Sequence, residues 1–357
     1  MNKQKILCER LKRQGFVNPL KDSRDTEAYE QLFRLLQPVA PVFNSRPGSP
    51  PKLVHRTDFN DSMVSANLRE QHRLVKGRFQ GGRIGYVLEE DLSLYGTVFR
   101  KPMQKTSLFH EEVISMIQNS GGISKDQLKE DLPFKAKDVM AALKRMQEAF
   151  LVYESQVDTD WNTGWFDFKT EWPGIELHDD PAEAVSEMLL RFLDAVVFAT
   201  LDQVRSWSEL RLKTIQHSLD SLMERGEIIR TEINGLGEGY MQTNDLYLSD
   251  EEIKPSIFVL DKSDFLVRVY LNQLKSMFSE RKVLQYILID GEFKGAVIGH
   301  WRIGPHDVED IELCLEQEEA EMRKQEIIAA VRDIYSRETT SILKFKGEPL
   351  LDVERRL

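Results

Sequence analysis

The middle of the chain contains an internal repeat. When residues 120–157 are moved forward by 76 positions without a gap, they fall on residues 196–233. The apolar positions then coincide, and so do several polar ones. The matched pairs include Asp126 with Asp202, Leu128 with Val204, Lys137 with Lys213, Leu143 with Leu219, and Met146 with Leu222. A repeat of this length indicates that one structural unit occurs twice.

Each copy has the pattern of three helices followed by a β-rich stretch. The expected elements are helices 108–118, 124–131 and 136–148 with strand 151–157, and then helices 181–198, 201–207 and 212–224 with strand 228–233. Ser124 and Gln127 have the spacing of a capping box, which fixes the start of the short helix. Three helices with a hairpin predict two tandem winged helices, although such units also serve as protein-interaction modules.

The segment before the repeat is also expected to be helical in part. Helices are predicted over residues 3–14 and 25–36, followed by a connector with five prolines in residues 37–51, which excludes a helix or sheet interior there. A further helix over residues 58–77 would place Arg69, His72, Arg73 and Lys76 along one stripe, because they are spaced at three or four residues. Residues 78–88 then predict a hairpin, and Glu89 begins another helix.

The segment after the repeat predicts a small α+β domain or a partly open barrel. A helix is expected over residues 263–279, strands over 283–290, 295–303, 308–315 and 342–345, and a charged helix over 316–337. The predicted fold class is therefore α+β, mainly α, with tandem winged-helix domains followed by a small C-terminal β-barrel-like domain. The expected units are residues 1–105, which form a winged-helix-like unit with a basic face, 106–175, 176–250 and 251–357.

The charge of the chain is unevenly distributed. The net charge is −11, yet the first 105 residues carry 19 Lys and Arg against 11 Asp and Glu. Clustering matters more than the net charge for binding phosphates, so we expect one cationic face that binds DNA. The expected DNA-binding residues are Arg69, Arg73, Lys76, Arg78 and Arg83, together with Lys135, Lys137 and Lys144 of the first repeat. The alternative is a solvated basic surface without a partner.

The composition limits the compartment and the chemistry. No apolar run approaches the ~20 residues of a membrane span, and residues 1–13 are too charged for a secretory signal. Cys8 and Cys314 are too far apart to indicate a disulfide framework or a zinc site. We therefore expect a cytoplasmic monomer that uses no metal and no small-molecule cofactor.

Two further patterns each allow two interpretations. The aromatic run Trp161, Trp165, Phe166, Phe168 and Trp172 falls where the first wing is expected; it either stacks on an exposed base or packs against a neighbouring unit. The glycine-rich residues 235–239 are either a wing turn or a phosphate-binding loop. The wing turn is favoured, because no Lys-Ser/Thr follows and no helix begins there.

The stretch Gly81-Gly-Arg-Ile-Gly-Tyr-Val-Leu-Glu-Glu-Asp-Leu92 resembles a motif of a known family. Bacterial winged-helix DNA glycosylases of the AlkZ type carry Arg-Gly-Thr-Leu-His-Leu-Val-x-x-Glu-Asp-Leu, and Gly82, Val87, Glu90, Asp91 and Leu92 match it. The family arginine and histidine fall on Gly81 and Gly85. The resemblance implies three tandem winged helices with a small C-terminal β-barrel, and the excision of bulky alkylated bases and unhooking of interstrand crosslinks in DNA. It therefore implies double-stranded DNA, with damaged duplex included, as the partner.

The resemblance also implies a catalytic Gln-apolar-Gln or Gln-apolar-Asp pair after the second helix. Such a pair orients the attacking water or stabilises the cationic sugar. Here the sequence is Gln37-Pro38-Val39, so Gln37 is the candidate catalytic residue, and its partner position holds a valine. We expect DNA association with weak or absent glycosylase activity. The alternatives are a non-enzymatic winged-helix transcription regulator or a protein-interaction scaffold; an apolar plug near Gln37 would favour these, and a polar pocket would favour the enzyme.

Overall fold

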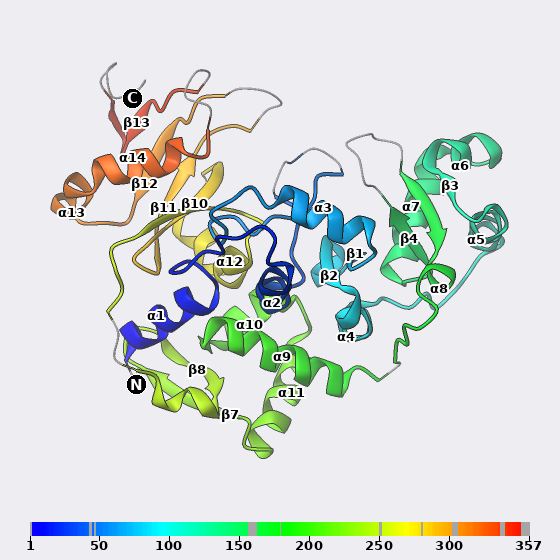
Figure 1. Cartoon of the computed structure of the whole chain (residues 1–357), viewed down its shortest axis with the longest axis horizontal. Coiled ribbons are helices and arrows are strands. Elements are labelled where there is room, and N and C mark those ends of the chain that lie inside the picture. The colour runs from blue at the N-terminus through cyan, green and yellow to red at the C-terminus, as the bar shows by residue number, and fades with distance from the viewer. Residues whose placement is uncertain are drawn as a thin grey trace.

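The structure is a computed structural model. It describes residues 2–42, 45, 48–155, 163–178, 180–249, 252–279, 281–301, 306–335 and 340–350. The described chain has a mixed fold of helices and four sheets. In Figure 1, the first repeat lies at the right, the second at the bottom, and the C-terminal sheet at the upper left, with the N-terminal segment between them.

The N-terminal segment forms helices around one hairpin. Its elements are α1 Lys3–Arg13, α2 Thr26–Leu36, α3 Ser62–Glu70, β1 Leu74–Arg78, η1 Gln80–Gly82, β2 Ile84–Leu88, η2 Glu89–Asp91 and α4 Leu92–Phe99. The side chain of Asn2 caps α1 and that of Asp25 caps α2, so the first two predicted helices and their starts are confirmed. The hairpin is confirmed as well, but it begins four residues before the predicted start.

The helix predicted over residues 58–77 is wrong in its second half. Helix α3 ends at Glu70, His72 has a φ of +59°, and the chain then enters strand β1. The successive residues Leu74 and Val75 are both 1% exposed in this strand, so both faces of the strand are covered. Burial of both side chains in the paired hairpin therefore outweighs the helical pattern of the polar residues.

The two repeats have the same order of elements. The first contains α5 Leu108–Ser120, β3 Ile123–Ser124, α6 Lys125–Asp131, α7 Ala136–Glu148, β4 Val152–Ser155, β5 Gly164–Asp167 and α8 Phe168–Glu171. The second contains α9 Ala182–Val196, β6 Phe198–Ala199, α10 Leu201–Ser208, α11 Leu212–Glu224, β7 Ile228–Ile233 and β8 Gly237–Gln242, followed by η3 Thr243–Tyr247. The strand orders, β3-β5-β4 and β6-β8-β7, correspond, since the last strand is central in each sheet.

Local detail confirms the repeat. The predicted capping box of Ser124 and Gln127 is present, and Thr200 and Gln203 form the matching box at the start of α10. Helices α7 and α11 are offset by the same 76 positions at both ends. The matched core residues Leu128 and Val204, Leu143 and Leu219, and Met146 and Leu222 are all 0% exposed.

The aromatic run of the first repeat packs inside the protein. Trp165, Phe168 and Trp172 are buried, and the ring of Trp172 lies 5.4 Å from His72 and 5.8 Å from Tyr153. This confirms the packing interpretation for these three residues, whereas Trp161 lies outside the described residues. The glycine-rich residues 235–239 lie at the turn between β7 and β8 and form the start of β8, as the turn interpretation predicted.

The C-terminal segment is built on one open sheet. Its elements are β9 Ile257–Asp261, α12 Phe265–Met277, β10 Val283–Ile289, β11 Glu292–Ile298, β12 Asp310–Leu313, α13 Gln317–Met322, α14 Lys324–Arg332, β13 Lys344–Phe345 and β14 Glu348–Pro349. The strand order is β14-β13-β12-β11-β10-β9, so within the described residues the sheet does not close into a barrel. The predicted helix 316–337 is divided at Arg323, and Met322, expected in its apolar stripe, is 80% exposed.

The hydrophobic core is divided unequally among these parts. One central cluster joins the N-terminal segment, the second repeat, α12 and one face of the C-terminal strands, and it includes Phe150, Phe168 and Trp172 of the first repeat. The first repeat has a separate cluster around Leu128 and Leu143, and the C-terminal sheet has another, which α14 covers. None of the described helices is both long and apolar enough to span a membrane.

Candidate functional site

Gln37, the candidate catalytic residue, follows α2 directly and is 1% exposed. Its Nε2 donates a hydrogen bond to Oδ2 of Asp91 at 2.6 Å, and its Oε1 accepts one from the backbone N–H of Leu88 at 2.9 Å. Both ends of the carboxamide are therefore bonded within the protein, and the side chain joins α2 to the segment that follows β2.

Asp91 is the centre of this network. Its carboxylate also accepts hydrogen bonds from Nε of Arg34 at 3.1 Å and from Nη1 of Arg191 at 2.6 Å. The residue is 6% exposed, so these partners replace the water that a carboxylate otherwise binds. Because Arg34 lies on α2 and Arg191 on α9, the carboxylate holds the N-terminal segment against the second repeat.

The proline-rich connector packs directly on strand β2. Val39 and Tyr86 exchange two backbone hydrogen bonds of 2.9 Å, so this part of the connector extends the hairpin sheet. A Cβ atom at Gly85 would lie 3.2 Å from Cβ of Pro38 and 3.8 Å from the carbonyl oxygen of Val39. The position that the resemblance gives to a histidine is therefore crowded by Pro38 and, at the same 3.2 Å, by the ring of Phe79.

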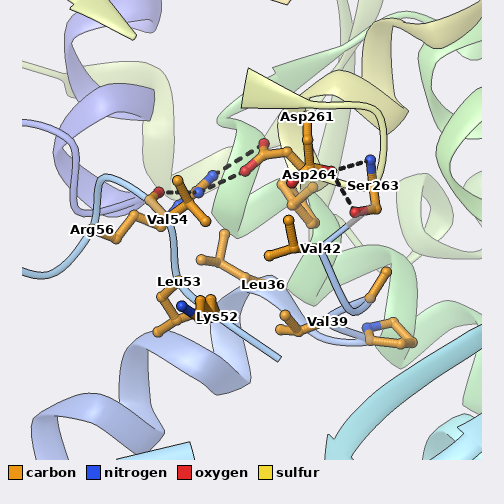
Figure 2. A pocket seen from close by; sticks show the side chains of 13 residues that line it. Leu36, Val39, Val42, Lys52, Leu53, Val54, Arg56, Asp261, Ser263 and Asp264 are labelled. Atoms are coloured by element: carbon orange, nitrogen blue, oxygen red, sulfur yellow. Dashed lines mark hydrogen bonds and ion pairs between the residues drawn. The ribbon is translucent and has the colours of Figure 1, made fainter. Parts of the chain in front are cut away.

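A small cavity lies beside Val39 and between the connector and the C-terminal segment. Figure 2 shows Asp261, Ser263 and Asp264 at one end of it, with Val39 at the other end. Its volume is about 30 Å³, which is enough for a water molecule but far below the ~150 Å³ of a cavity that holds benzene. The cavity has no room for a nucleobase. The other lining residues are Leu36, Pro38, Ala40, Val42, Lys52, Leu53, Val54, Arg56 and Phe265.

The polar side chains of this cavity bind one another. Nη1 of Arg56 lies 2.7 Å from Oδ2 of Asp264, and the two side chains are 2% and 7% exposed. The backbone N–H of Ser263 donates to Asp261 at 2.6 Å, and the Ser263 hydroxyl donates to the carbonyl oxygen of Pro41 at 2.8 Å. Sequence reasoning missed these residues. The N-cap position of Asp264 was readable from its place before an apolar helix, but its partner Arg56 is 208 residues away.

The expected cationic stripe does not form, because α3 ends before it is complete. Lys76 lies on β1 and pairs with Glu154 of β4 at 3.0 Å, with its side chain 10% exposed; this burial lowers the pKa of Lys76. Nε of Arg78 donates to Oε1 of Gln147 on α7 at 2.7 Å. These two cations join the hairpin to the first repeat.

The other expected cations of the N-terminal segment also have partners. Arg69 is 8% exposed and donates to the carbonyl oxygen of Gly48 at 2.7 Å. The side chains of Arg73 and Arg83 are about half exposed; Arg73 pairs with Glu30 and Arg83 with Glu209. The three expected lysines of the first repeat, Lys135, Lys137 and Lys144, are exposed on or beside α7.

A basic cleft lies between the two repeats and the end of the N-terminal segment. It has a volume of about 670 Å³, and no Asp or Glu is among the described residues that line it. The lining residues are Arg100, Lys101, Pro102, Met103, Gln104, Lys105, His110, Arg145 and Arg211. Arg145 comes from α7 and Arg211 precedes α11, the corresponding helices of the two repeats. The cations of the cleft come from three parts of the chain, which are residues 100–105, helix α7 and the start of α11. No local spacing connects these parts, so the sequence did not reveal the cleft as a site.

Comparison with known proteins identifies the family. The family model described as "DNA glycosylase AlkZ-like" matches residues 100–325, which is more than half of the chain. The chain belongs to the AlkZ-like DNA glycosylase family. Among solved structures, this chain is similar to the Streptomyces sahachiroi DNA glycosylase AlkZ. The two structures superpose with a TM-score of 0.70, and their sequences are 14% identical. That match covers 96% of this chain and 99% of the other. No match is found among the curated proteins.

Within the described residues, this AlkZ-like chain has no group of three or more His, Cys, Asp or Glu side chains that could hold a metal ion. The candidate site has two separate parts. One is the closed network around Gln37 and its small cavity, and the other is the open basic cleft.

Proposed function

We propose that this family member binds double-stranded DNA through the basic cleft and excises bases weakly or not at all. The observation that carries the binding proposal is the convergence of Arg100, Lys101, Lys105, Arg145 and Arg211 on one cleft, where Glu148 pairs with Lys101 and Arg145 and offsets one of these five charges. Cations gathered in this way neutralise successive phosphates and release counterions, which is the main source of non-specific affinity for DNA.

The common topology of the repeats supports their interpretation as winged helices within four units that end near residues 105, 175, 250 and 357. Helices α7 and α11 then take the place of the helices that approach DNA in such units. Lys135, Lys137 and Lys144 add positive charge to α7, and Arg211 stands at the start of α11. Arg73 and Arg83 are secondary candidates, since each pairs with a carboxylate and neither lines this cleft. We propose a monomer that needs no cofactor.

Weak or absent excision is supported by the surroundings of Gln37. The carboxamide is 1% exposed, and its bonds to Asp91 and to the Leu88 N–H hold it inside the protein, away from solvent that could supply an attacking water molecule. Val39 supplies no polar group, and the adjoining cavity of about 30 Å³ does not admit a base. The polar side chains around Gln37, which are Asp91, Arg34 and Arg191, are bonded to one another in a network and do not face an open pocket that holds a base, and this supports a binding role over catalysis.

The test is a gel-based assay on alkylated and crosslinked duplexes, run together with a series of salt concentrations. We expect the logarithm of the DNA affinity to fall linearly with the logarithm of the salt concentration. The slope should be about −4, the value for contacts with about four or five phosphates. We expect base release no greater than without protein. Robust excision that Gln37→Ala abolishes would refute the catalytic half of the proposal, and binding without salt dependence would refute the other half.

A further inference from the structure

The two repeats differ in what packs on the groove between their first two helices. In the second repeat, helix α12 packs against α9 and α10. The ring of Phe265, at the start of α12, lies 6.2 Å from Phe192 and 5.8 Å from Trp207. The Ser206 hydroxyl of α10 donates to the backbone carbonyl of Arg268 at 2.8 Å. A helix therefore fills the groove between the first two helices of this repeat.

The corresponding groove of the first repeat is open. The 76-residue offset places Met116 at the position of Phe192 and Asp131 at the position of Trp207. Both line a groove of about 850 Å³ that runs along α5 to the end of α6. Figure 1 shows α5 and α6 at the edge of the molecule, away from α12. In the described chain, their main packing partners are β3, β5 and α7 of the same repeat.

The open groove has an apolar floor. Met116 is partly exposed, and Leu108, at the start of α5, is 78% exposed. Ile123 and Leu132 complete the apolar lining. A groove with an apolar floor and polar edges on a helical surface is typical of a site for another amphipathic helix, which places residues at three- and four-residue spacing into it.

The rim of the groove is acidic and sets the charge of the occupant. Glu111, Glu112 and Asp131 line it. The second repeat has Met188 and Trp207 at the positions of Glu112 and Asp131, and both are buried. A neutral helix docked as α12 docks would bury these carboxylates without partners, at a considerable cost. A helix with Lys or Arg beside its apolar face would pair with them.

We propose that the groove between α5 and α6 binds a basic amphipathic helix of a partner protein, in the position that α12 takes on the second repeat. The apolar face of that helix lies on Met116 and Leu132, and its cations face Glu112 and Asp131. This surface is distinct from the basic cleft, because no residue lines both.

The probe for the test is a fluorescein-labelled peptide with the sequence of Phe265–Met277, in which the positions flanking its apolar face are lysine. A matched peptide has glutamate at the same positions. Fluorescence anisotropy with the full chain measures the affinity of each peptide. The protein variants are Met116→Lys, which places a cation in the groove, and the control Met63→Lys, at a methionine that is 70% exposed on α3.

We expect the lysine peptide to bind at least about tenfold more tightly than the glutamate peptide, with an affinity that falls as salt is added. Met116→Lys should weaken binding by about tenfold or more, while Met63→Lys leaves it unchanged. Thermal denaturation of both variants verifies that each is folded. Equal affinity for the two peptides, or binding unaffected by Met116→Lys, overturns the proposal. Self-association of the chain that Met116→Lys abolishes would also overturn it, because the groove would then join two copies.

Discussion

The side-chain nitrogen of Gln37 lies 2.6 Å from a carboxylate oxygen of Asp91, across 54 residues of sequence. Replacing Gln37 with alanine leaves the buried Asp91 oxygen and the Leu88 N–H with one partner fewer. We therefore expect Gln37→Ala to lower the free energy of unfolding by about 1–3 kcal/mol, as measured by urea denaturation. Gln31→Ala, at an exposed position of the same helix, is the control and should change it by less than about 0.5 kcal/mol. Equal effects of the two substitutions would contradict a structural role for Gln37.

The core of each repeat gives a second prediction. Leu143 and Leu219 occupy equivalent positions and are both 0% exposed. Truncation of either to alanine removes apolar contacts and leaves a cavity, so each should cost about 2–5 kcal/mol of stability. Leu108→Ala, at a leucine that is 78% exposed, serves as the control for the same substitution at the surface. A loss below about 1 kcal/mol at either core position would show that the site collapses around the cavity.

The basic cleft gives a third prediction. Lys105 and Arg211 are exposed and lie on different segments of its lining. The double variant Lys105→Glu and Arg211→Glu should flatten the salt dependence of DNA affinity by about two units of slope, since each phosphate contact contributes about −0.9. The matched control is Lys254→Glu with Lys344→Glu, at exposed lysines of the C-terminal segment. If both double variants change the slope equally, binding depends on overall charge and not on the cleft.

The buried ion pair of Lys76 and Glu154 predicts a dependence on pH. Burial lowers the pKa of Lys76 below its ordinary value of about 10.5, despite the raising effect of Glu154. Between the lowered value and 10.5, the unfolded chain holds more protons than the folded chain, so stability rises with pH in this interval. The unfolding free energy of the wild type should therefore increase relative to that of Lys76→Met as pH rises toward 10.5. Urea denaturation at several alkaline pH values measures this difference, and a constant or falling difference would contradict the shift.

The repeats were predictable because their determinants are local. Ser124 and Gln127 define a helix start within four residues, and the apolar positions of α7 recur at helical spacing. Helix α7 accordingly has the predicted bounds at both ends. The same kind of information located α1, α2 and α11.

The cationic residues were placed less well because long-range contacts decide their environment. Arg69 and Lys76 have helical spacing in the sequence, yet the chain between them turns into β1. The partner of Arg78, Gln147, is 69 residues away, and no local pattern connects the two. Arg100 and Arg211 meet in the cleft only because the two repeats pack on the same segment. Spacing identifies residues that share an element, but not residues that different elements bring together.

The separate hydrophobic cluster of the first repeat has a consequence for how the molecule opens. The helices α9, α10 and α11 share the central core with the N-terminal segment and α12. The first repeat contributes Phe150, Phe168 and Trp172 to that core, but its helices α5, α6 and α7 pack on a separate cluster around Leu128 and Leu143. Parts with their own cores form separate cooperative units, which open without the rest. We therefore expect the amide hydrogens of α5, α6 and α7 to exchange with solvent together, and faster than those of α9 and α11. Two repeats with the same order of elements then differ in dynamics, because the three helices of only one of them contribute side chains to the central core.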